Sequence, residues 1–127
     1  MTDEDLLLDR ALDVYRRLQV HHARLVAEQS AAQGVNATDM RFLFYLAAQA
    51  PTGILPKDVT QYLGMSTGAT TSLVDRLETR GLVHRIPNPG DRRSVFVTIS
   101  PEGESMVRDV KDVFRDCLLY TSDAADE

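Results

Sequence analysis

The chain has 127 residues, of which 43% are hydrophobic and 26% charged, proportions that suit one globular domain with its own core. No stretch approaches the roughly 20 consecutive apolar residues that a membrane-spanning helix needs. The acidic start, residues 1–5, is also the opposite of a basic signal peptide, so we expect a cytoplasmic protein with no membrane partner. The net charge of −5 excludes an evenly basic surface, which makes the distribution of charge more informative than its sum.

The first predicted element is one long helix over residues 3–32, because no glycine or proline interrupts the chain before Gly34. Its larger side chains recur at intervals of three and four residues: Leu8, Leu12, Tyr15, Leu18, His22, Leu25 and Gln29. A helix this long has more apolar surface than one small core covers. We therefore expect it to pack against a partner helix, with packing inside a monomer as the weaker alternative.

The histidines do not form a metal-binding pattern. His21 and His22 are adjacent, so they point about 100° apart on a helix. Neither has a cysteine or a second histidine three or four residues away, and His84 stands alone. We expect no metal site and no cofactor.

A second helix is expected from Asn36, with Asp39 completing a capping box. This helix is apolar on more than one side, which predicts that it is sandwiched between other elements. It could also line a cavity beside the long first helix. Tyr15, His22 and Tyr45 are the candidate polar contacts for a ligand there, with core packing as the alternative for each.

Two short helices follow, one from Pro56 to Gly64 and one from Ser66 to Thr79, after a short strand over Ile54-Leu55 beside the hairpin. Thr70, Leu73, Val74 and Leu77 occupy one face of the later helix, which is the face expected to be buried. The other face carries small residues near its start: Thr67, Gly68, Ala69, Thr71 and Ser72. Small side chains allow a helix to approach base edges closely, so these two helices are a candidate helix-turn-helix.

A β-hairpin is expected next, with strands over residues 82–86 and 95–99. The segment between them contains two prolines, a glycine and the run Asp91-Arg92-Arg93, so it must turn. Residues 66–99 hold five arginines and three acidic residues, a local charge of +2. Arginine suits a phosphate or a narrow minor groove, and Asp91 is expected to steady a neighbouring arginine.

Several linked segments resemble the MarR family of winged-helix regulators, in order and spacing, from about Asn36 to Gly103. They are Leu63-Gly64-Met65-Ser66, Leu73-Val74-Asp75-Arg76-Leu77-Glu78, Arg80-Gly81-Leu82-Val83, Asp91-Arg92-Arg93 and Thr98-Ile99-Ser100-Pro101-Glu102-Gly103. Thr60 departs from the family, which usually has alanine there, and this predicts slightly looser packing.

The resemblance implies a mainly α fold with a small β-hairpin wing (α+β), a homodimer, and a recognition helix in the DNA major groove. It also implies, for many members, a response to small aromatic ligands. The residues expected to contact double-stranded DNA are Ser66, Thr67, Gly68, Ala69, Thr71, Ser72, Arg76, Arg85, Asp91, Arg92 and Arg93. The expected divisions are a dimerisation helix over 1–34, a winged helix-turn-helix domain over 35–100 and the start of a C-terminal dimerisation helix over 101–116.

The final run, Cys117 to Glu127, does not continue the apolar pattern of the helix that Ser100-Pro101 begins. It resembles the in-frame translation of a transposase adaptor used in sequencing libraries, so we expect the native sequence to stop near Asp116. The only cysteine would then be foreign, and loss of three acidic residues would raise the net charge from −5 to −2.

No catalytic constellation stands out, because the chain has no Gly-x-Ser-x-Gly elbow, no phosphate-binding loop and no metal-ligand spacing. We therefore expect no enzyme. The leading hypothesis is a ligand-responsive, dimeric DNA-binding repressor that recognises palindromic operators. The alternative is a winged-helix module that binds protein, or a fragment too short to dimerise.

Overall fold

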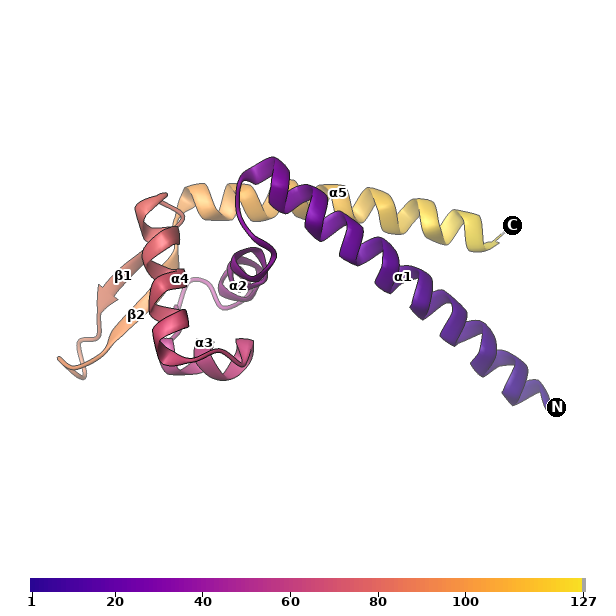
Figure 1. Cartoon of the computed structure of the whole chain (residues 1–127), viewed down its shortest axis with the longest axis horizontal. Coiled ribbons are helices and arrows are strands. Elements are labelled where there is room, and N and C mark those ends of the chain that lie inside the picture. Colours follow the sequence, from indigo (N-terminus) through magenta and orange to yellow (C-terminus); the bar gives the residue numbers. More distant parts are fainter. Residues whose placement is uncertain (127) are drawn as a thin grey trace.

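The computed structural model describes the backbone of residues 1–126, and side chains for residues 1–116 and Leu119. The described chain is mainly helical with one antiparallel hairpin, which confirms the predicted fold class. Its elements are α1 (Asp3–Gln33), α2 (Ala37–Ala48), α3 (Pro56–Leu63), α4 (Thr67–Thr79), β1 (Val83–Pro87), β2 (Val95–Ile99) and α5 (Pro101–Asp126). In Figure 1, α2, α3, α4 and the hairpin form a lobe, and the long ends of α1 and α5 leave it on the side opposite the hairpin.

The ends of the first two helices follow from their capping residues. Gly34 ends α1 in the left-handed conformation, with φ of 69°. The last helical residue is Gln33, one residue beyond the predicted end of the helix. Asn36 caps α2 as expected, because its side chain accepts a hydrogen bond from the Asp39 amide at 2.8 Å. The return half of the predicted capping box does not form, since the Asp39 carboxylate is bonded to Arg76.

The core lies where α2, α4, the hairpin and the first turns of α5 meet. Met40, Phe42, Leu43 and Leu46 are all at most 2% exposed, so α2 is sandwiched as predicted. The buried face of α4 is also confirmed, and comprises Thr70, Leu73, Val74 and Leu77. The core is completed by Val35, Ile54, Val59, Leu82, Val83, Val97, Val107 and Val110.

The hairpin register places Val83 opposite Ile99 and Pro87 opposite Val95. The second strand has its predicted bounds, and the first lies one residue later than predicted. The expected strand at Ile54 is a single bridge to Val97, with N–O distances of 3.0 and 2.8 Å. That bridge attaches the segment before α3 to the base of the hairpin.

Thr60 contributes a contact that the family comparison did not predict. Its hydroxyl lies 3.0 Å from the Thr70 hydroxyl, and so joins α3 to α4. Each hydroxyl also lies within hydrogen-bond distance of a backbone carbonyl, Pro56 at 3.0 Å for Thr60 and Ser66 at 2.9 Å for Thr70. Each hydroxyl has one proton, so Thr70 donates to Ser66 when Thr60 donates to Thr70. The expected loosening at Thr60 is therefore replaced by a hydrogen bond across the helix-turn-helix.

The C-terminal helix is fixed to the hairpin at its start and continues beyond the expected native end. The backbone of α5 is helical through Asp126, past Asp116. The expected foreign run, Cys117–Glu127, has side chains that, apart from Leu119, lie outside the described residues, so its origin stays a hypothesis. Within the described part of the chain, no helix is both long and apolar enough to span a membrane.

The junction between β2 and α5 is closely packed. The buried Ser100 hydroxyl donates to the Gly81 carbonyl at 2.6 Å and accepts from the Gly103 amide at 3.0 Å. A Cβ atom at Gly103 would overlap the Leu82 carbonyl oxygen and would lie 2.7 Å from Ile99 Cγ1. Glycine is thus required by the close approach of this turn to the hairpin.

We predict that Gly103→Ala lowers the free energy of unfolding by about 1–3 kcal/mol, because the added methyl group overpacks this junction. Urea unfolding at fixed protein concentration measures the change. Gly68→Ala is the matched control, since a Cβ atom there meets nothing within 4 Å and alanine favours a helix. Equal loss of stability in both variants would contradict the packing argument.

Candidate nucleic-acid interface and adjoining cavity

The outward face of α4 has the small, uncharged surface that the sequence predicted. Thr67, Gly68, Thr71 and Ser72 are exposed, while Ala69 is half-buried. The Ser66 hydroxyl caps the helix by accepting from the Ala69 amide at 3.1 Å. Thr67, Gly68, Thr71 and Ser72 therefore form a surface, here termed the reading face, that can approach a groove without displacing a long side chain.

Arg76 is held within the chain. Its guanidinium donates to both carboxylate oxygens of Asp39, at 2.8 and 3.2 Å. The Asp39 side chain is only 5% exposed, and its hydrogen bonds raise the pKa of Arg76. Asp39 thus needs Arg76 as its partner, and this arginine joins α4 to α2. The Arg76 side chain is still 51% exposed, so its DNA contact stays a prediction.

Arg85 is likewise bonded on both sides of its guanidinium. It contacts Asp75 at 2.6 Å and Glu78 at 2.7 Å, and its backbone amide donates to Glu78 at 3.2 Å. Partial burial acts to lower the pKa of Arg85, but the bonds to the two carboxylates outweigh it and raise the pKa. Arg85 therefore fastens β1 to α4. Its contact with a phosphate stays a prediction.

The tip of the hairpin leaves its cations exposed. In the described part of the chain, neither Arg92 nor Arg93 forms an ion pair. Asp91 accepts from the Arg93 backbone amide at 2.9 Å, so it braces the turn through the backbone and not through the expected bond to a guanidinium. Asn88 adds bonds to the Gly90 amide and the Ser94 hydroxyl, both at 2.9 Å. A turn held by side-chain to backbone bonds keeps both arginines available for an anion.

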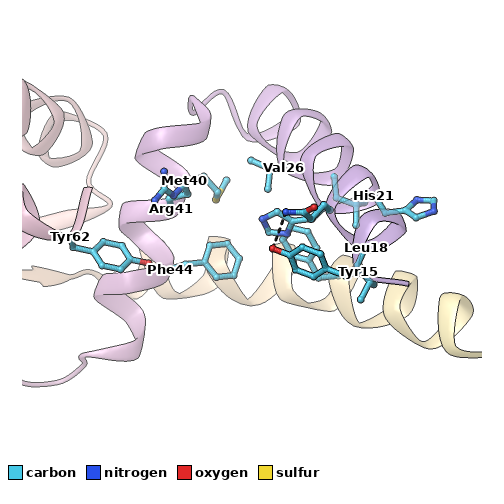
Figure 2. Close-up of a pocket in the computed structure, with 12 residues that line it drawn as sticks. Tyr15, Leu18, His21, Val26, Met40, Arg41, Phe44 and Tyr62 are labelled. Carbon is cyan, nitrogen blue, oxygen red and sulfur yellow. Dashed lines mark hydrogen bonds between the residues drawn. The ribbon is translucent and has the colours of Figure 1, made fainter. Parts of the chain in front are cut away.

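A cavity of about 600 Å³ lies beside the interface, between α1, α2 and α5. Figure 2 shows side chains of α1 and α2 meeting across it, with Tyr62 at its far end. Tyr15 and His22 line it, as the sequence predicted. The remaining lining residues are Leu18, Gln19, His21, Leu25, Val26, Met40, Arg41, Phe44, Tyr62 and Phe114.

Tyr45 is not among the residues that line the cavity, contrary to expectation. It stacks on Tyr62 of α3, with ring centroids 4.0 Å apart and planes 10° apart. The neighbouring Phe44 lines the cavity instead, because adjacent helical residues point about 100° apart. Tyr45 thus joins α2 to the helix-turn-helix, while Tyr62 lies between that stack and the cavity.

The cavity combines an apolar wall with polar groups from Tyr15, Gln19, His21, His22, Arg41 and Tyr62. The Tyr15 hydroxyl accepts from Gln19 Nε2 at 3.0 Å, and His22 stacks on Phe114 with centroids 5.5 Å apart. Among the described residues, no group of three or more His, Cys, Asp or Glu side chains could hold a metal ion. An apolar wall with a few polar groups, in a cavity of this volume, is typical of small-molecule sites.

The contact that Arg80 makes with the end of α1 was not predicted from the sequence. Its guanidinium donates to the carbonyl oxygens of Gly34 at 2.7 Å and Gln33 at 2.9 Å. Nothing local to Arg80 predicts these partners, because they lie 46 and 47 residues earlier in the chain. The contact joins the C-terminal ends of α4 and α1.

We predict that Arg76→Ala lowers the free energy of unfolding by about 1–3 kcal/mol, because Asp39 would stay buried without its partner. Arg92→Ala and Arg93→Ala serve as controls that remove the same charge. Since both are exposed and unpaired within the described residues, each should change stability by less than about 0.5 kcal/mol. Chemical denaturation of the three variants tests this, and equal effects would refute the distinction.

The comparison with known proteins agrees with this geometry. Residues 33–94 match the model of the MarR family. The Escherichia coli transcriptional repressor MprA is 32% identical over 87 residues, covering 68% of this chain and 49% of that protein. The Bacillus subtilis HTH-type transcriptional regulator YcgE is 32% identical over 119 residues, covering 92% of this chain and 73% of that protein. The chain thus spans about half the length of MprA and a larger share of YcgE.

Solved structures share the fold over most of the chain. RV1404 from Mycobacterium tuberculosis has a TM-score of 0.75 at 25% identity, covering 98% of this chain and 82% of that one. The complex of Staphylococcus aureus MepR with DNA also has a TM-score of 0.75, at 17% identity, covering 88% of this chain and 90% of that one. The long match to YcgE, with which the family model agrees, shows that the chain belongs to the MarR family.

Proposed function

We propose that this chain is a sequence-specific, double-stranded DNA-binding transcription repressor. The observation that carries the proposal is the pairing of the uncharged reading face of α4 with a hairpin tip whose two arginines are exposed. Side chains of the reading face would contact base edges, and Arg92 and Arg93 would contact phosphates or the minor groove. The related MprA is a transcriptional repressor, which supports the assignment, and a DNA target implies a cytoplasmic location.

The acting species in this proposal is a homodimer assembled through α1. Seven large apolar residues of α1 are between 39% and 68% exposed, and Ser30 is its only buried residue. The seven are Leu6, Leu7, Leu8, Leu12, Val14, Tyr15 and Val20. Two-fold pairing would cover this surface, and would present two recognition helices to half-sites about 10 base pairs apart, so the operator should be palindromic.

The cavity beside α1 would make this binding responsive to a small aromatic ligand. It is bounded by α1 on one side and by Tyr62 of α3 on another, so an occupant would touch both the dimerisation helix and the helix-turn-helix. A ligand shifts the DNA-binding equilibrium only by its difference in affinity for the free and the DNA-bound conformations.

We predict that selection from a random duplex pool recovers a palindrome. Arg93→Ala should then weaken binding to all sequences alike and reduce the slope of log affinity against log salt by about 2, because the homodimer loses one phosphate contact in each protomer. Ser72→Ala should weaken recognition at one base position by ~1–3 kcal/mol and leave the salt slope unchanged.

The alternatives give different results in the same experiment when sedimentation is measured in parallel. A dimer that enriches no sequence would favour a winged helix that binds protein. A monomer that enriches no sequence would favour a fragment unable to assemble. Affinity unaffected by Arg93→Ala would exclude the hairpin tip from the interface.

We predict that benzoate or phenol, used as simple aromatic probes, raises the dissociation constant of the operator complex by at least about fivefold, the lower end of typical couplings between sites. Val26→Trp should bring the ratio of the dissociation constants with and without the probe towards one, since the indole would occupy the cavity that Val26 lines. Ala23→Trp, on the same helix but outside the lining, is the matched control. A ratio of one in the unaltered chain for both probes would contradict the aromatic class.

A further inference from the structure

Arg80 caps the C-terminal end of one helix with a side chain from another. The last carbonyl groups of a helix lack partners within it and form the negative end of the helix dipole. Two of these, on Gln33 and Gly34, accept from the two terminal nitrogens of the Arg80 guanidinium at 2.9 and 2.7 Å. The planar guanidinium donates to both carbonyl oxygens at once in a fixed geometry. A lysine ammonium group would not fix the direction of its hydrogen bonds in this way.

A second arginine of α4 holds the other side of the same junction. Arg76 and Arg80 are four residues apart, so they project from one face of the helix. Arg80 bonds to the end of α1, and Arg76 bonds to Asp39 in the first turn of α2. The short connection from α1 to α2 is therefore fixed to the C-terminal half of α4 at two points.

These polar contacts connect elements with different tasks. The principal packing partners of α1 are α2 and α5, whereas α4 packs mainly on α3 and β1. The residues that line the cavity from α1 lie between Tyr15 and Val26, and its exposed apolar residues lie between Leu6 and Val20. Arg80 is the direct bond between the helix that bears those surfaces and the helix that bears the reading face.

We infer that Arg80 is a positioning residue for DNA recognition, which fixes the orientation of α4 relative to α1 and hence the spacing of the two recognition helices in a dimer. The inference rests on the proposed function, because it concerns operator binding. Arg80 acts in it through α1 and makes no contact with DNA itself. Its loss would let α4 reorient against α1 while leaving the cations of the hairpin tip in place.

The first test separates positioning from an ordinary phosphate contact. Arg80→Ala should weaken binding to the selected palindrome about tenfold or more, while affinity for random duplex and the salt slope stay as in the unaltered chain. Arg80→Lys keeps the charge but not the two-pronged geometry, so it should not restore operator affinity. Arg92→Ala removes the same charge and is the control. It should weaken binding to both the palindrome and the random duplex, and it should lower the salt slope.

A phosphate contact by Arg80 would give the opposite pattern, with equal loss on both duplexes, a lower salt slope and rescue by lysine, and it would overturn the inference. Unchanged operator affinity in Arg80→Ala would overturn it as well. Failure of the unaltered chain to select any palindrome would instead contradict the proposed function, and the second test then decides the inference alone.

The second test needs no DNA. Spin labels at Arg24→Cys on α1 and Ser72→Cys on α4, in a Cys117→Ser background diluted with unlabelled chain, report the distance between the two helices. Both labelled positions are exposed. The distribution of distances between the two labels should be narrow with Arg80 present, and it should be broader or shifted in Arg80→Ala and Arg80→Lys. An unchanged distribution would refute the positioning role, whatever the DNA results. Circular dichroism melts verify that each variant is folded.

Discussion

The burial of one face of α4 is the constraint on which the rest of this structure depends. Thr70, Leu73, Val74 and Leu77 enter the core, so Thr67, Gly68, Thr71 and Ser72 must point outward. α4 packs mainly on α3 and β1, and these contacts hold its outward face in place. The reading face needs a helix held in this way, because its short side chains cannot extend to the base edges when the helix is wrongly oriented.

Arginine has two separate uses in this acidic chain. Arg76 bonds to a buried carboxylate, Arg80 to helix-terminal carbonyls and Arg85 to two exposed carboxylates, and so they position α4 against α2, α1 and β1. Arg92 and Arg93 stay exposed on a turn that Asn88 and Asp91 hold through backbone amides. A net charge of −5 is compatible with the proposed DNA binding, because these two arginines lie together at one projecting tip.

The long helices and the lobe are joined where the cavity lies. α1 extends far beyond the lobe in Figure 1, and most of its apolar surface has no partner within the described chain. The middle of α1, from Tyr15 to Val26, contributes to the cavity, and its C-terminal end is bonded to Arg80. Dimer assembly, ligand occupancy and helix orientation would therefore all act on α1 in the proposed regulator.

The sequence by itself determined the helices and the hairpin, the Asn36 and Ser66 caps, the buried face of α4 and the exposed turn, since each follows from spacing of a few residues. Only the tertiary structure decided which partners the arginines have within the chain. The partners of Arg76 and Arg80 lie 37 to 47 residues away, so no local pattern distinguishes them from Arg92 and Arg93. Tyr45 and Thr60 follow the same rule: each is on a correctly predicted helix, but its contact belongs to a neighbouring helix whose rotation the core sets. Periodicity fixes the face that a side chain occupies, and packing between helices fixes what that face meets.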